Sequence, residues 1–173
     1  MNKKIFGLGI FVALMVIGLD QLTKLAILNY FNGSSEIVSV TSFFNLLLTW
    51  NKGVSFGMFN SGAEITVLVL TIFPIVITLV LGVWLWQTTT KLLALGLGLI
   101  MGGALGNIID RIRFGGVIDF LDFHVVNYHW PAFNIADSAI TLGVALLLID
   151  SWYLKSEAPK KLNLKDEVNN DFS

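Results

Sequence analysis

The sequence of 173 residues contains no cysteine and only three prolines. The absence of cysteine excludes disulfides, thiol nucleophiles, cysteine-ligated metals and lipidation of this chain on cysteine. Charged residues are also scarce, at 13% against roughly 25% in an ordinary soluble domain. The net charge is −1 and the chain has no basic patch, which argues against nucleic-acid binding. Any chemistry therefore depends on carboxylates, hydroxyls, amides or the two histidines.

Apolar residues make up 55% of the chain, and the mean hydropathy is +0.76. A helix needs about 20 apolar residues to cross a bilayer. We predict an all-α membrane protein with four spans, at about residues 5–28, 65–86, 92–112 and 133–153, and loops at about 29–63 and 113–132. Residues 1–154 then form one integral membrane domain, and the polar residues 155–173 form a disordered tail.

The lysines indicate the orientation of the spans, because positive charge marks the cytoplasmic side. They precede the first span, separate the second from the third, and follow the fourth: Lys3, Lys4, Lys91, Lys155, Lys160, Lys161 and Lys165. Both termini are therefore expected in the cytoplasm and the two longer loops outside. The first span resembles a signal peptide but lacks a small-x-small cleavage site after it, so we expect a retained anchor.

Polar residues gather at the predicted outer ends of the first, third and fourth spans. They are Asp20 and Lys24, then Asn107, Asp110 and Arg111, then Asn134, Asp137, Ser138 and Thr141. In the third span they share one helical face with Gly103, and Gly102 with Gly106 forms a G-x-x-x-G pattern that lets another helix approach closely. This predicts a polar pocket near the outer leaflet. A transporter would instead carry polar groups near the midplane.

Asp137 is the acid that most needs a function, because an ionised side chain at the bilayer centre costs about 3 kcal/mol and its helical face looks inward. Two nearby carboxylates are what an aspartyl hydrolase requires. Asp119 and Asp110 are both candidate partners, and spacing does not choose between them.

Structural interpretations of the same acids remain open. Asp20 and Lys24, four residues apart, are equally well explained as an interfacial ion pair. Asn107, Asp110 and Arg111 are better explained as a buried network that locks helices together than as reacting groups.

Four further titratable residues are expected to carry no chemistry. His124 and His129 lack a second-ligand pattern such as H-E-x-x-H, so we expect no metal site and no cofactor. Asp122 is interpreted as a solvated loop or helix-face acid, and Asp150 as a water-facing helix end.

Five motifs between residues 19 and 141 resemble lipoprotein signal peptidase, the bacterial type II signal peptidase. In chain order they are D-Q-x-x-K from Asp20, N-x-G-x-S-F-G from Asn51, G-G-A-L-G-N-x-x-D-R from Gly102, V-x-D-F from Val117 and F-N-x-A-D-S from Phe133. Each motif is weak alone, but five in order with four spans form a specific match.

The resemblance implies an aspartyl endopeptidase of the bacterial inner membrane that acts on diacylglyceryl-modified prolipoproteins and cuts just before the lipidated cysteine. It assigns the catalytic dyad to Asp119 and Asp137. Dyad support or substrate positioning is assigned to Asp20, Lys24, Asn51, Gly53, Asn107, Asp110, Arg111, Asn134 and Ala136.

The resemblance also implies two structures outside the membrane, a small β-rich cradle within residues 36–62 and a short extracytoplasmic helix within residues 117–130. The expected partners are the lipid-modified prolipoprotein, membrane lipid and globomycin-type inhibitors, and the chain is expected to be a monomer. The alternative from another class is a non-enzymatic membrane module, either a lipid-binding scaffold or a small carrier, in which the acids are structural. A presenilin-type protease is not supported, because the sequence has no G-x-G-D.

Overall fold

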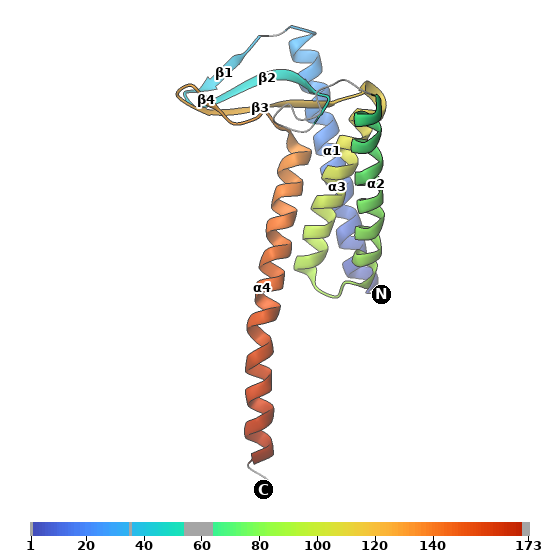
Figure 1. The fold of residues 1–173 in the computed structure, drawn as a ribbon, viewed down its shortest axis with the longest axis vertical. Helices are drawn as coiled ribbons and strands as arrows, with labels where there is room; N and C mark the ends of the chain where they lie inside the picture. The colour runs from blue at the N-terminus through green and yellow to red at the C-terminus, as the bar shows by residue number, and fades with distance from the viewer. Residues whose placement is uncertain (1, 35, 54–63, 171–173) are drawn as a thin grey trace.

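The computed structural model describes residues 2–34, 36–53 and 64–170. Along the chain the elements are α1 (Lys3–Phe31), β1 (Val38–Thr41), β2 (Phe44–Asn51), α2 (Glu64–Gln87), α3 (Lys91–Phe114), β3 (Val117–Val125), β4 (Tyr128–His129) and α4 (Ile135–Asn170). Figure 1 shows the helices side by side and the strands gathered across one end of them. The predicted helical membrane fold with a small β-rich part is therefore confirmed. Residues 54–62 of the expected cradle lie outside the described residues.

Four helices in the described part of the chain are long and apolar enough to cross a membrane, which confirms the prediction of four membrane-spanning helices. α4 differs most from its prediction, because it continues to Asn170. Its backbone is thus helical through residues 155–170, where composition predicted a disordered tail. Lysine, leucine and glutamate are frequent in this stretch and favour the helix, which is the physical reason for the difference.

α3 is the central helix, since α1, α2 and α4 all pack against it. α1 approaches it backbone to backbone: a Cβ atom at Gly102 would lie 2.7 Å from the carbonyl oxygen of Ala13. A Cβ atom at Gly106 would lie 2.6 Å from Oδ2 of Asp20. The close helix contact predicted from the G-x-x-x-G pattern is therefore present.

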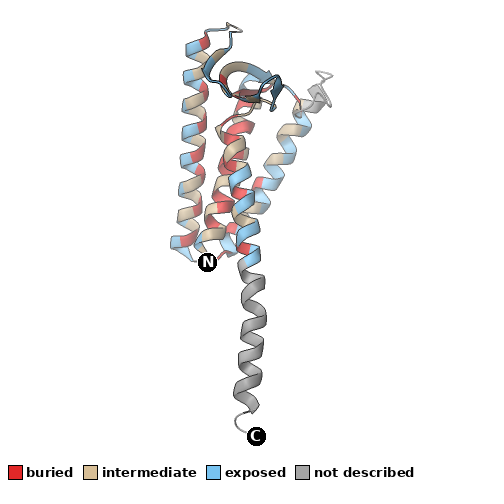
Figure 2. Ribbon diagram, turned by 90° about the vertical axis from the view of Figure 1, so that its left-hand side faces the viewer, coloured by how far each residue is buried: buried red, intermediate tan, exposed pale blue. Residues whose placement is uncertain are grey.

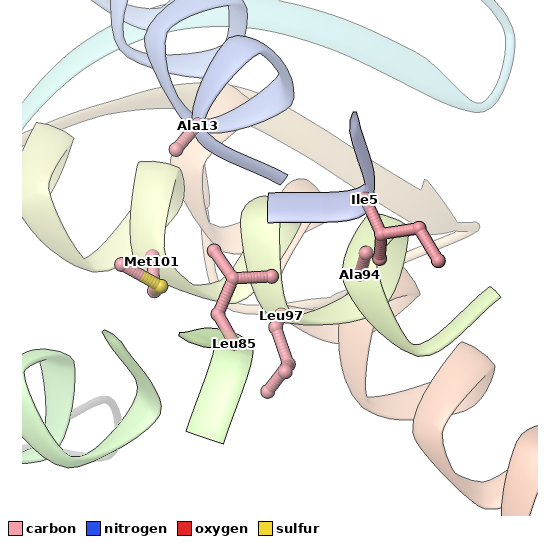
Figure 3. Packing of buried hydrophobic residues seen from close by; sticks show 6 residues of the cluster. All are labelled: Ile5, Ala13, Leu85, Ala94, Leu97 and Met101. Carbon is pink, nitrogen blue, oxygen red and sulfur yellow. The ribbon is translucent and has the colours of Figure 1, made fainter. Parts of the chain in front are cut away.

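A cluster of apolar side chains fills the bundle where α1, α2 and α3 meet (Figure 3). Its members are Ile5 and Ala13 from α1, Leu85 from α2, and Ala94, Leu97 and Met101 from α3. Lipid tails are as apolar as leucine, so close packing holds these helices together more than removal from water does. This core leaves the opposite end of the bundle free for polar groups.

The outward faces of the helices carry large exposed apolar side chains, among them Phe11, Leu22, Phe73, Leu79 and Leu148. Figure 2 shows the buried residues concentrated in the interior of the bundle and the exposed ones on its outer helices. So much apolar surface is unusual on a soluble protein. It is the expected surface of helices that face hydrocarbon.

The strands form one antiparallel sheet in the order β1-β2-β3-β4. β2 and β3 form its longest pairing, in which Thr49 lies opposite Asp119 and Asn51 opposite Val117. The register of this pair shifts between Leu46 and Thr49. The sheet thus brings the Asn51 and Asp119 motifs, which are far apart in the sequence, onto neighbouring strands.

The expectation of a short extracytoplasmic helix within residues 117–130 is wrong, because this stretch forms β3 and β4 instead. Its first part, VIDFLDFHV, is rich in β-branched and aromatic residues, which pack well on a pleated sheet. Pairing with β2 then satisfies its backbone hydrogen bonds. The backbone of this stretch therefore forms more hydrogen bonds as a strand beside β2 than it would as an isolated turn of helix.

Candidate active site

The start of α4 is closed by two reciprocal hydrogen bonds between Asn134 and Asp137. Asn134 Oδ1 accepts the backbone N–H of Asp137 at 2.9 Å, and Asp137 Oδ2 accepts the backbone N–H of Asn134 at 3.2 Å. This arrangement is a capping box, which satisfies N–H groups that a helix start leaves unpaired. It holds the Asp137 carboxylate at the positive end of the α4 dipole.

The side-chain amide of Asn134 connects this cap to a second acid. Its Nδ2 atom donates to Asp119 Oδ1 at 2.8 Å, and the residue is fully buried. One residue therefore contacts both Asp119 and Asp137. The acid that shares Asn134 with Asp137 is Asp119, and Asp110 belongs to a different set of contacts.

Asp119 lies in β3 with only 2% of its surface exposed. Burial, together with the nearby charge of Asp137, raises its pKa to about 7, although hydrogen bonds from Asn51 and Asn134 and the charge of Lys24 act to lower it. An acid with this pKa is half protonated near neutral pH. Asp119 is thus able both to hold a proton and to release one under physiological conditions.

Asn51, at the end of β2, supplies the second donor to Asp119. Its Nδ2 atom lies 2.9 Å from Asp119 Oδ2, and its Oδ1 atom accepts the backbone N–H of Gly53 at 3.2 Å. Because Gly53 occupies the amide oxygen, the NH2 group faces the acid. Gly53 therefore orients the Asn51 side chain toward Asp119.

Asn107, in α3, links Asp137 to a buried lysine. Its Nδ2 atom donates to Asp137 Oδ1 at 2.8 Å, while its Oδ1 atom accepts from Lys24 Nζ at 3.1 Å. Asn134 Nδ2 also lies 3.2 Å from the same oxygen. Both acids thus sit in one network of oriented amides.

Lys24 forms two buried ion pairs, at 2.8 Å to Asp20 and 2.7 Å to Asp110. All three side chains are at most 2% exposed, so the ion pair of Asp20 and Lys24 lies inside the protein and includes Asp110 as well. Buried charges stabilise only when their remaining hydrogen-bond positions are filled. Gln21 fills some of them, because its Nε2 atom lies 3.2 Å from Asp20 and 2.9 Å from Asp110.

Backbone groups complete this cluster of Asp20, Lys24 and Asp110. Asp20 Oδ1 accepts the N–H of Ala136 at 3.0 Å, and Asp110 Oδ2 accepts the N–H of Ile118 at 3.2 Å. The cluster therefore joins α1 and α3 to the start of α4 and to β3. Asp110 therefore lies in a buried network that connects several elements.

An open cavity of about 880 Å³ lies beside Asp137. Asn51, Arg111 and Asp137 line it, together with Gly53, Leu70, Trp130, Pro131, Ala132, Phe133, Ser138, Thr141, Leu142 and Ala145. Asp137 and Arg111 line the cavity, and so does Asn51, which donates a hydrogen bond to Asp119. Both acids are therefore at this cavity or in direct contact with its lining.

No group of three or more His, Cys, Asp or Glu side chains within the described ranges is arranged to hold a metal ion. The chemistry that the described arrangement supports on its own residues is proton transfer between carboxylates. A buried acid with a pKa of about 7 beside a second carboxylate is suited to general acid and base catalysis.

Two acids expected to be solvated are buried instead. Asp122 is 3% exposed and bonds to Asn45 and His129, and Asp150 is 8% exposed and accepts a hydrogen bond from Thr90. Strand alternation was the missed signal for Asp122, since it places residues 119 and 122 on opposite faces of one strand.

Comparisons with known proteins agree with one another. A family model described as Signal peptidase (SPase) II matches residues 12–153. A lipoprotein signal peptidase of Rhodopseudomonas palustris strain TIE-1 is 46% identical over 149 residues, covering 83% of this chain and 91% of that protein. A protein of the same name from Burkholderia mallei strain SAVP1 is 48% identical over 140 residues, covering 80% and 84%. A solved structure titled as a bacterial membrane enzyme matches with a TM-score of 0.74 and 32% identity, covering 89% of this chain and 92% of that one.

Proposed function

Because the chain belongs to the signal peptidase II family, we propose that Asp119 and Asp137 are the catalytic dyad of an aspartic endopeptidase. The chain is a membrane enzyme that cleaves signal peptides from lipoproteins. A non-enzymatic scaffold or carrier is not favoured, because relatives at 46% and 48% identity are named as peptidases. The observation that supports the dyad best is that Asn134 contacts both carboxylates.

The two acids have different surroundings, and these support different roles. Asp137 lines the cavity, where it can meet a water molecule, and it accepts N–H groups from Asn107 and Asn134. Asp119 is buried with its pKa raised to about 7, which favours the protonated form. Asp137 is therefore the proposed general base and Asp119 the general acid.

Peptide hydrolysis follows from this pair. Asp137 takes a proton from a water molecule whose oxygen attacks the scissile carbonyl carbon, while Asp119 gives its proton to the carbonyl oxygen. When the tetrahedral intermediate collapses, the C–N bond breaks and the proton on Asp137 passes to the leaving nitrogen. The hydroxyl proton of the intermediate returns to Asp119, so the dyad is restored.

The other predicted residues support the dyad. Asn51, Asn107 and Asn134 donate hydrogen bonds to the two acids. The remaining supporting residues orient these amides or fix the elements that carry them, namely Asp20, Lys24, Gly53, Asp110 and Ala136. Arg111 lines the cavity and is proposed to position the substrate backbone or a lipid phosphate.

The proposed substrate is a prolipoprotein with a diacylglyceryl-modified cysteine, cut just before that cysteine. The apolar lining of the cavity, including Leu70, Leu142 and Ala145, is compatible with lipid chains, and globomycin-type inhibitors are proposed to occupy the same space. All the groups named come from one chain, which is compatible with a monomer. Membrane lipid is the proposed surrounding partner.

The proposed location is the bacterial inner membrane, with the sheet on the outer side. Figure 1 shows the N-terminus and the far end of α4 on the side of the bundle opposite the sheet. The basic residues lie near these ends, which supports a cytoplasmic position for both termini. Residues 1–154 remain the proposed membrane domain.

The dyad is tested with Asp119→Asn and Asp137→Asn in the full-length enzyme. Each variant is expected to insert into membranes and melt normally but to leave lipid-modified prolipoprotein uncut in a gel-mobility assay. Asp150→Asn is the matched control, since it also changes a buried acid of α4, 13 residues after Asp137, and is expected to cleave. Cleavage by both dyad variants would overturn the assignment.

A further inference from the structure

The carboxylate of Asp122 joins three strands of the sheet on the face opposite Asp119. Asn45 Nδ2, from β2, lies 2.8 Å from Asp122 Oδ2. His129 Nδ1, from β4, lies 2.9 Å from Oδ1 and 3.0 Å from Oδ2. Asp122 is buried, whereas half of the His129 side chain is exposed. β4 is only two residues long, so the contact between His129 and Asp122 adds to its short pairing with β3.

The charges around Asp122 favour an ion pair. Burial acts to raise the pKa of Asp122, but hydrogen bonds from Asn45 and His129 and the charges of His129 and His124 lower it overall. His129 contacts Asp122 and His124, both from β3, and Asn45 from β2 donates to the same carboxylate. His124 stacks on His129 at 4.9 Å, and neither of its ring nitrogens has a hydrogen-bond partner among the described residues.

His129 stands directly before the segment that forms one wall of the cavity. This wall segment consists of Trp130, Pro131, Ala132 and Phe133. At its first residue, the N–H of Trp130 donates to the carbonyl oxygen of Phe123 at 2.8 Å. The segment is thus attached to β3 beside the ion pair of Asp122 and His129.

The far end of the wall segment is held separately. The N–H of Phe133 donates to Leu121 at 3.1 Å, and the carbonyl oxygen of Phe133 accepts from Leu121 at 2.9 Å and from Phe120 at 3.0 Å. These backbone bonds fix Phe133, the residue directly before Asn134, which contacts the dyad. We therefore expect a change at His129 to affect the start of the wall segment more than the two catalytic acids.

We propose that Asp122 and His129 are positioning residues that hold the wall segment against the lipid-modified substrate and so determine its affinity. This inference rests on the proposed use of the cavity as the substrate site. It assigns the pair no part in proton transfer at the scissile bond. Loss of the ion pair raises KM and leaves kcat nearly unchanged.

The test measures kcat and KM of the full-length enzyme on a lipid-modified prolipoprotein. His129→Gln and Asp122→Asn are each expected to raise KM about fivefold, with kcat within about twofold. The double variant is expected to be no worse than either single one, because both remove the same contact. His129→Lys keeps a cationic hydrogen-bond donor at this position and is expected to keep KM near the wild-type value.

His124→Gln is the matched control, since it removes the stacked ring and leaves the bond between Asp122 and His129. Its KM is expected within about twofold of the wild-type value. An equal rise in KM for His124→Gln would assign the effect to stacking and overturn the proposal. So would unchanged KM in folded His129→Gln, or a loss confined to kcat. The proposed function is tested separately, by the activity of the Asp119 and Asp137 variants. A negative result for Asp122 and His129 would therefore not contradict the proposed function.

Discussion

Lys24 Nζ in α1 lies 3.1 Å from Asn107 Oδ1 in α3, and this contact determines which end of the amide faces Asp137. An ammonium group only donates hydrogen bonds, so Asn107 turns its oxygen to Lys24 and its NH2 group to the acid. Lys24 is thereby connected to the proposed general base without touching it. The buried ion pairs of the same lysine fix its position.

Removing the cation tests the stabilising role of this cluster. Lys24→Met is expected to lower the free energy of unfolding by about 3–5 kcal/mol, because Asp20 and Asp110 stay buried without a counter-charge. Thermal unfolding in detergent measures the loss. Adding Asp20→Asn and Asp110→Asn to the same variant is expected to restore part of the stability. A triple variant as unstable as Lys24→Met would instead assign the loss to packing of the lysine stem.

Asn134 is expected to support structure and catalysis through different atoms. Asn134→Asp keeps an oxygen that caps α4 but loses the NH2 group that donates to Asp119. Its melting temperature is expected to fall, because the new oxygen faces three acceptors, on Asn107, Ile118 and Asp119, and its activity is expected to fall by about 100-fold or more. Asn134→Ala also loses the cap, which costs about 1 kcal/mol. Equal activities of Asn134→Asp and the wild type would contradict the role of the NH2 group.

Asp119 is expected to make stability depend on pH. Its pKa is raised from 3.8 to about 7, chiefly by burial, so between these pH values the folded protein binds more protons than the unfolded chain. Stability therefore falls as the pH rises from about 4 to about 7 and then levels off. Melting temperatures across this range are expected to decline less steeply in Asp119→Asn. Identical slopes in the two proteins would show that Asp119 ionises normally in the fold.

Gly102 is expected to be intolerant of a side chain. Gly102→Ala places a Cβ atom 2.7 Å from the carbonyl oxygen of Ala13, so α1 must move away from α3. Such overpacking costs about 1–3 kcal/mol, measured by thermal unfolding. Gly18→Ala is the control, because nothing lies within 4 Å of its new Cβ atom. Equal stability of the two variants would disprove the tight contact.

The sequence alone predicts the membrane-spanning helices and the polar end of the bundle well. Long apolar runs have few alternatives in a bilayer, since each backbone polar group must be satisfied within its own segment. The G-x-x-x-G pattern likewise predicts a close approach of helices, although not that the partner is α1. The helix expected at residues 117–130 came from the family resemblance, whereas the stretch forms strands that depend on pairing with β2, which is distant in sequence.

Local sequence thus determined the class of protein, the spans and the motifs that identify the family. The tertiary structure decided which polar side chains meet: Asp137 shares Asn134 with Asp119, while Asp110 pairs with Lys24. It also buried Asp122 beside His129. The physical reason is that hydropathy acts along a single segment, whereas the environment of a charge is set by side chains that arrive from other helices and strands. The structure therefore distinguishes the proposed reacting acids from those that hold the fold together.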